Sequence, residues 1–262
     1  MKLSPKEWKS LARRNLIGRY GILIFCIVLT EMISFLLSAV FLTQNISGWL
    51  FVLCGFIISL LTSVLYTGLG YMYLQTARDQ AVRVQDLFFA LNHSPDTVLL
   101  IGLFIRAGAL LSAAPLYLMT LLLDLRWQLY DALTVSSAGA ALQILGLYLL
   151  FFLLWAVLFA AIMLRYAMAC FIYLDHPAWS MVNILRESRN RMSGHLLTYA
   201  KLLLSFVGML LMGVLSFGIG LLWVMPYIYV SSAQFYLDLT DQLSPEFIHP
   251  ATDEMNTHES AI

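Results

Sequence analysis

Residues 142–164 read LQILGLYLLFFLLWAVLFAAIML and contain no charged residue. A continuous apolar run of roughly 20 residues matches the length of a helix that crosses a bilayer. Strands of a membrane barrel would alternate apolar and polar residues over about ten positions, and this stretch does not alternate. Because the lipid interior offers no hydrogen-bond partner to the backbone, the stretch predicts a transmembrane α-helix.

Similar apolar runs recur along the chain. Of its 262 residues 61% are hydrophobic and only 11% are charged, whereas soluble domains carry roughly 25% charged residues. We therefore predict an all-α, polytopic membrane bundle of about six transmembrane helices over residues 1–240, followed by an acidic, disordered cytoplasmic tail over residues 241–262. The predicted spans are Tyr20–Leu42, Trp49–Tyr71, Thr97–Leu123, Leu142–Leu164, Leu196–Leu215 and Ile219–Leu239.

The distribution of basic residues predicts the orientation of this bundle. All Lys and Arg residues except Arg106 and Arg126 lie in the amino-terminal segment, in the loops after the second and fourth spans, or at the near end of the fifth span. Positively charged residues are retained on the cytoplasmic side of a membrane. Both termini are therefore predicted to be cytoplasmic. The net charge of zero argues against a nucleic-acid partner.

A short amphipathic segment precedes each predicted hairpin. The first segment begins with the capping-box sequence Ser4-Pro5-Lys6-Glu7. The three apolar faces consist of Trp8, Leu11, Ala12 and Leu16, then Val84, Leu87, Phe88 and Leu91, and then Met181, Ile184, Leu185, Ser188 and Met192, with Gly194 placed to end the last segment. The chain thus divides into three tandem units of an interfacial helix plus a hairpin. An internal repeat and a plain stack of hairpins both account for this division.

The last third of the chain carries a family resemblance. The matching residues are Ser188, Met192-Ser193-Gly194-His195, Phe217-Gly218-Ile219-Gly220-Leu221-Leu222-Trp223, Pro226-Tyr227 and Phe235-Tyr236-Leu237-Asp238-Leu239. The chain resembles an uncharacterised family of bacterial integral membrane proteins, a domain of unknown function. It is also distantly similar to the membrane domain of glycerophosphoryl diester phosphodiesterases. The resemblance implies a six-span bundle in the bacterial inner membrane and no reaction, because those enzymes place catalysis in a separate soluble barrel.

Two charged residues fall inside predicted spans. Glu31 lies about eleven residues and Arg106 about nine residues from the cytoplasmic ends of their spans, so at 1.5 Å per residue their depths differ by only about 3 Å. Ionised groups inside a membrane are costly and usually face a partner or water. The two residues are therefore predicted to form a buried ion pair, which is either structural or part of a gate or substrate site.

Two further groups of residues are candidates for function. Pro226 interrupts the last predicted span beside Trp223 and Tyr227, where a kink would shape a cavity or only bend the helix to fit its neighbours. On the polar side of the first amphipathic helix, Lys6, Lys9, Arg13 and Arg14 would contact anionic lipid. Alternatively, that helix covers the base of the bundle.

We expect a non-enzymatic membrane protein that binds lipid or a membrane-protein partner. The alternative is a small transporter or export permease for an amphiphilic solute. The sequence has neither a phosphate-binding Gly-Lys-Ser/Thr loop nor a nucleophile elbow, so we expect no enzymatic activity. The three cysteines lie in apolar runs and the histidines lack the spacing of metal ligands, so no metal site and no cofactor are predicted.

Overall fold

A computed structural model describes residues 3–42, 48–132 and 138–242, and these residues are almost entirely helical. Residues 43–47, which lie between the first two predicted spans, and nearly all of the predicted tail are outside the described residues. The elements are α1 (Pro5–Leu16), α2 (Tyr20–Leu42), α3 (Gly48–Ala77), the 3₁₀ helix η1 (Val84–Phe88), α4 (Phe89–Asn92), α5 (Pro95–Ala132), α6 (Ala138–Tyr166), α7 (Ala169–Asp175), α8 (Met181–Met192), α9 (Leu196–Leu204), α10 (Val207–Leu215) and α11 (Leu221–Leu239).

The helices follow the predicted spans except at the fifth. The first predicted span coincides with α2, and the second, third and fourth lie within the longer helices α3, α5 and α6. The fifth predicted span consists of two helices, α9 and α10, which are separated by Ser205 and Phe206. By length and composition, four stretches of the described residues could cross a membrane: Tyr20–Ala39, Leu53–Ala77, Leu145–Asp175 and Leu196–Leu215. The bent pair Val84–Asn92 and Pro95–Gly108 is a fifth if it counts as one span, and the sixth predicted span, which corresponds to α11, is not among these candidates.

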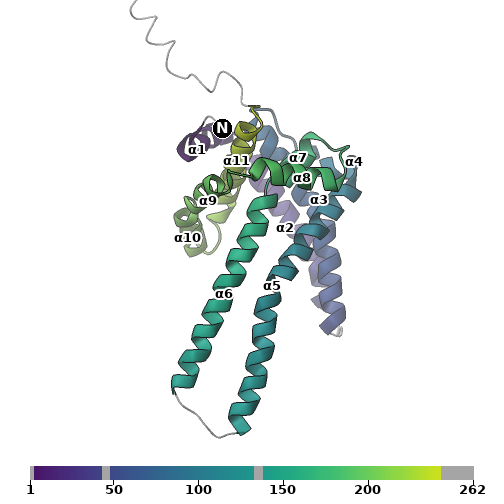
Figure 1. The fold of residues 1–262 in the computed structure, drawn as a ribbon. Helices are drawn as coiled ribbons and strands as arrows, with labels where there is room; N and C mark the ends of the chain where they lie inside the picture. Colours follow the sequence, from purple (N-terminus) through teal and green to yellow (C-terminus); the bar gives the residue numbers. More distant parts are fainter. Residues whose placement is uncertain (1–2, 43–47, 133–137, 243–262) are drawn as a thin grey trace, which may run out of the picture.

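The long hairpin of α5 and α6 extends away from the other helices (Figure 1). The remaining elements gather at one end of the molecule around α3, α7 and α11. At this end each amphipathic segment packs against the last long helix or helices of the preceding unit. The η1–α4 segment packs against α3, and α8 packs against α6 and α7. The first segment, α1, packs against α11 of the third unit. These contacts close the three units into a ring.

The ring is closed by a buried cluster between α1 and α11. Trp8 is fully buried and packs edge-on against Phe235, with the ring centroids 5.0 Å apart. The indole Nε1 of Trp8 donates a hydrogen bond of 3.2 Å to the carboxylate of Asp238, which also accepts the backbone N–H of Leu3. Because the indole N–H would be costly to bury without a partner, Asp238 fixes the orientation of α1 on the bundle.

The carboxyl-terminal end of α3 is held by side chains from both ends of the chain. The last carbonyl groups of a helix have no partner within the helix. The carbonyl of Ala77 accepts hydrogen bonds from the amides of Asn15 on α1 and Gln234 on α11, at 3.0 and 2.8 Å. Residue 78 extends the network, because Arg78 pairs with Asp175 at 2.6 Å. These bonds join the three units at a single level of the bundle.

The first and third units share a local backbone geometry that supports a repeat. Both α1 and α8 end in a residue with φ near −60° and ψ near 125°, followed by a glycine with positive φ: Ile17-Gly18 and Ser193-Gly194. These angles define a type II turn, in which glycine is favoured at the second central position. Each turn is closed by a hydrogen bond of 3.0 Å, from Arg19 to Leu16 and from His195 to Met192.

The capping prediction for α1 is confirmed. The backbone N–H of Ser4 donates a 2.6 Å hydrogen bond to the Glu7 carboxylate, and Pro5 occupies the first helical position. This bond to the charged form lowers the pKa of Glu7 below its ordinary value. At neutral pH Glu7 is therefore ionised and stabilises the start of the helix.

Candidate ligand-binding cavities

A basic cavity lies on the outer side of α1. It has a volume of about 440 Å³ and is lined by Lys6, Lys9, Ser10, Arg13, Arg14 and Ile17 of α1 together with Tyr227 of α11. The spacing of these residues along α1 places them on one helical face, opposite the buried face of Trp8, Ala12 and Leu16. The four cations predicted to contact lipid therefore line one cavity, together with one of the three residues predicted around the Pro226 kink.

Lys9 is also part of the structure that holds α1 in place. Its Nζ donates hydrogen bonds to the carbonyl and the hydroxyl of Ser205, at 3.3 and 3.1 Å, and lies 4.3 Å from the ring centroid of Phe206. Burial and, to a lesser extent, the neighbouring Arg13 lower the pKa of Lys9. Lys9 therefore joins α1 to the break between α9 and α10 as well as lining the basic cavity.

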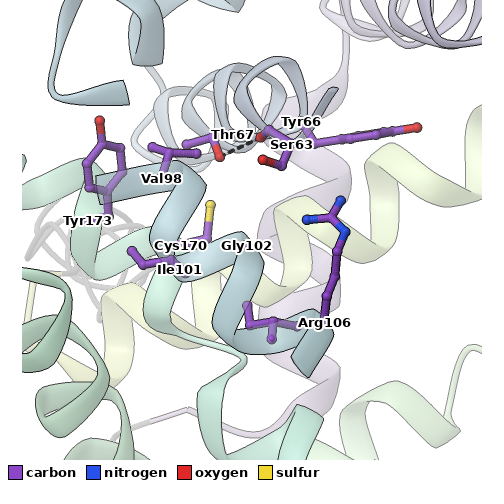
Figure 2. A pocket seen from close by; sticks show the side chains of 10 residues that line it. Ser63, Tyr66, Thr67, Val98, Ile101, Gly102, Arg106, Cys170 and Tyr173 are labelled. Carbon is purple, nitrogen blue, oxygen red and sulfur yellow. Dashed lines mark hydrogen bonds between the residues drawn. The ribbon is translucent and has the colours of Figure 1, made fainter. Parts of the chain in front are cut away.

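Two further cavities lie on either side of Tyr66 and Cys170, which line both of them. The first, the Glu31 cavity, has a volume of about 310 Å³ and lies between α2, α3, α7 and α11. The second, the Arg106 cavity, has a volume of about 360 Å³ and lies between α3, α5 and α7 (Figure 2). Ligand sites in proteins are typically concave, mostly apolar and roughly 300–1,000 Å³ in volume.

The Glu31 cavity is aromatic, with a small number of polar groups. The hydroxyl of Tyr66 donates a 2.9 Å hydrogen bond to the Glu31 carboxylate. Tyr73 and Tyr229 stack with their ring centroids 5.0 Å apart, and the hydroxyl of Tyr199 donates to the hydroxyl of Ser232 at 3.3 Å. Apolar side chains complete the lining: Ile27, Leu69, Phe171 and Met225. The arrangement offers a carboxylate beside an apolar, aromatic surface.

The Arg106 cavity places a guanidinium group against α3. Arg106 extends from α5 towards Ser63 and Tyr66 (Figure 2) and donates a hydrogen bond to the carbonyl of Ser59. Gly102 makes room for this side chain, because a Cβ atom at that position would lie 2.9 Å from Nη1 of Arg106. The carbonyl of Ser63 accepts a hydrogen bond from Thr67, as the dashed line shows.

The predicted partners Glu31 and Arg106 therefore line neighbouring cavities without forming an ion pair with each other in the described part of the chain. Each binds a residue of α3 instead, Glu31 at Tyr66 and Arg106 at Ser59. Around Pro226, α11 is continuous from Leu221 to Leu239. Trp223 is half exposed, and the residues that line these three cavities do not include Trp223 or Pro226.

Several residues of these sites had not been identified from the sequence. The tyrosines of the Glu31 cavity are common residues in membrane spans, and nothing in the pattern separates a cavity tyrosine from a lipid-facing one. By contrast, a sequence motif marks Asp175 and Asp238, the carboxylates that bind Arg78 and Trp8. Both end the motif Tyr-Leu-Asp, at 173–175 and 236–238, and Tyr73-Leu74-Gln75 occupies the same place at the end of α3.

The comparisons with known proteins show a family. A family model described as "Protein of unknown function (DUF975)" matches residues 1–243. No curated protein and no solved structure is detectably similar to the chain. The expected similarity to the membrane domain of glycerophosphoryl diester phosphodiesterases therefore stays a prediction. Because the family model covers the whole helical part of the sequence, the chain belongs to this family of proteins of unknown function, DUF975.

Proposed function

We propose that this protein is a non-enzymatic, six-span protein of the bacterial inner membrane that binds anionic lipid headgroups. Both of its termini would lie in the cytoplasm. The observation that carries the proposal is the basic cavity, which Lys6, Lys9, Arg13 and Arg14 line together with Tyr227. A phosphate group offers the negative charge and the acceptor oxygens that such a cavity would bind.

The docking of α1 supports binding at a fixed site rather than insertion of α1 into the lipid. The residues Trp8, Ala12 and Leu16 are fully buried against the bundle, so this apolar face is already occupied by protein. The outer, basic face remains open to a ligand. Under the proposed topology α1 lies at the cytoplasmic surface, where anionic lipids attract basic segments.

A second candidate function is transport of an amphiphilic solute. The specific observation that favours it is the pair of adjoining cavities, one with a carboxylate and one with a guanidinium, on either side of Tyr66. Polar groups at membrane depth frequently mark substrate pathways.

The proposal is tested with the purified full-length chain in a neutral detergent. Native mass spectrometry would compare binding of phosphatidylglycerol, which is anionic, with binding of phosphatidylcholine. We expect a preference for phosphatidylglycerol that weakens in high salt. The double variant Lys6→Gln, Arg13→Gln should bind phosphatidylglycerol roughly tenfold or more weakly, since each basic residue contributes about 1 kcal/mol near an anionic surface.

A matched control removes the same charge from another amphipathic helix. Arg186 and Arg189 are exposed on α8 and do not line the basic cavity. The double variant Arg186→Gln, Arg189→Gln should keep the preference of the wild type. Equal losses in the two double variants would mean a general electrostatic attraction and would contradict a site on α1. If a co-purified protein occupies the cavity instead, the proposed lipid ligand is wrong.

A further inference from the structure

Within the part of the chain that the structure describes, the Glu31 and Arg106 cavities each hold a charged group that has no partner of opposite charge. In the described residues Glu31 accepts only the hydroxyl of Tyr66, and Arg106 donates only to a backbone carbonyl. Under the membrane placement proposed above, both groups lie within spans, where a charge without a partner is unfavourable. As lined by the described residues, the Glu31 cavity could therefore accept a cationic group and the Arg106 cavity an anionic group.

The two charges are arranged along one helix. Tyr66, which binds Glu31, and Ser59, which binds Arg106, lie two turns apart on α3, which corresponds to about 10 Å along the helix axis. Tyr66 and Cys170 line both cavities, so the two cavities adjoin. A single ligand that extends past Tyr66 would reach both charged groups.

We propose that the adjoining cavities bind one zwitterionic amphiphile, with its cationic group at Glu31 and its anionic group at Arg106. A carboxylate that accepts an ammonium group and a guanidinium that binds a phosphate or carboxylate are both charge-assisted contacts. The apolar part of the ligand would lie against Ile27, Phe171 and Met225 of the Glu31 cavity. The Glu31 side chain is accessible, so a ligand can reach it.

This site is distinct from the basic cavity on α1, which has different lining residues and only cationic charged groups. A purely anionic lipid would satisfy the cavity on α1 but would leave Glu31 without a counter-charge. The two proposals therefore predict different ligand preferences and can fail separately.

The first experiment leaves the Glu31 and Arg106 cavities unchanged and compares the wild type with the double variant Lys6→Gln, Arg13→Gln. The purified full-length chain in a maltoside detergent is titrated with three probes that share one acyl or alkyl chain length: lysophosphatidylethanolamine, lysophosphatidylglycerol, which lacks the ammonium group, and an alkyltrimethylammonium, which lacks the phosphate. Native mass spectrometry measures binding. In the double variant Lys6→Gln, Arg13→Gln, in which anionic lipid at α1 contributes little, we expect lysophosphatidylethanolamine to bind on the order of tenfold to a hundredfold more tightly than either other probe, because each of those leaves one charged group of the cavities unpaired. Equal binding of the three probes would overturn the proposal.

A fourth probe separates a lipid from a free zwitterion. Phosphoethanolamine has the same two charged groups as lysophosphatidylethanolamine and no acyl chain. It should bind much more weakly, since the apolar lining contributes to binding only when a chain covers it. Phosphoethanolamine that binds as tightly as the lipid would show that the site does not recognise an amphiphile.

Single variants test which residue recognises which charged group of lysophosphatidylethanolamine. Glu31→Gln should abolish the preference over lysophosphatidylglycerol and keep the preference over the alkyltrimethylammonium. Arg106→Gln should do the opposite. This split cannot arise from a general loss of folding. Glu187→Gln and Arg165→Gln change the same charges outside the cavities and should retain both preferences. Variants that lose both preferences together would contradict the assignment.

The same titration distinguishes this site from the one on α1. The double variant Lys6→Gln, Arg13→Gln should keep the preference for lysophosphatidylethanolamine whether or not the basic cavity binds anionic lipid. If the double variant loses that preference, the zwitterionic ligand is bound at α1, and the proposal for the Glu31 and Arg106 cavities is wrong.

Discussion

Gly68 lies where α3 meets the backbone of η1. A Cβ atom at this position would overlap the carbonyl oxygen of Leu87, a residue that is itself fully buried. Backbone atoms cannot move aside as the end of a flexible side chain can. The close packing of the second amphipathic segment on α3 therefore requires glycine at position 68.

Gly68→Ala is expected to destabilise the protein by about 1–3 kcal/mol, which is typical of overpacking in a tight core. Gly55→Ala is the matched control, because Gly55 lies on the same helix and has no atom near its added Cβ. Alanine there should be neutral or slightly stabilising. Thermal unfolding of the two variants in detergent would measure the difference. Equal melting temperatures would contradict the packing of η1 described above.

At the scale of single residues, the sequence indicated the charged groups and not their neighbours. Glu31 and Arg106 stand out because charges are rare in apolar runs. Counting residues from the span ends predicted depths about 3 Å apart, whereas the residues of α3 that they bind, Tyr66 and Ser59, lie two turns apart. The sequence did not predict that α3 supplies the hydrogen-bond partners of both charged residues. Which residue of α3 each would bind depends on the rotation and packing of three helices, and hydropathy does not contain that information.

Among the elements, α1 is the one whose role changed most between sequence and structure. Its amphipathic pattern fits a helix that lies on lipid and also one that packs on protein. The structure has the second arrangement, with Trp8 bound to Asp238 and Asn15 bound to Ala77. A lipid ligand therefore meets only the basic face of α1.

Trp8→Ala is expected to destabilise the intact protein by about 3–5 kcal/mol, the usual range for removing a buried large aromatic side chain. It should also release α1, so that trypsin cleaves after Arg13 or Arg14 under conditions in which the wild type is protected. Ser10→Ala, at an exposed position on the same helix, should change neither property. If Trp8→Ala leaves both melting and cleavage unchanged, α1 is not anchored as described.

Periodicity and capping signals predicted the amphipathic elements well, since both are local properties. The capping box placed the start of α1, and Gly194 marked the end of α8. The break between α9 and α10 was not predicted. At this break, the backbone carbonyl of Ser205 accepts a hydrogen bond from Lys9, which is 196 positions away in the sequence. Hydropathy along Leu196–Leu215 is continuous and gives no sign of that contact.

At the scale of the whole molecule, the open question is the topology. With six spans and cytoplasmic termini, reporter fusions at residue 45, within 133–137 and at residue 218 should read as periplasmic. Fusions at residues 90 and 190 and at the carboxyl terminus should read as cytoplasmic, as the distribution of Lys and Arg predicts. A carboxyl terminus on the periplasmic side would require an odd number of spans, and the six-span arrangement would then be wrong.

The ring of three units depends on a contact between the first helix and the last. Trp8 and Asp238 are 230 positions apart, so α1 is synthesised long before the helix that covers it. Until α11 emerges from the ribosome, α1 displays an uncovered apolar face with an indole in its centre. A finished molecule hides that face. A chain that stops before α11 would therefore keep the apolar face of α1 exposed, and a membrane protease that recognises exposed apolar helices would degrade it.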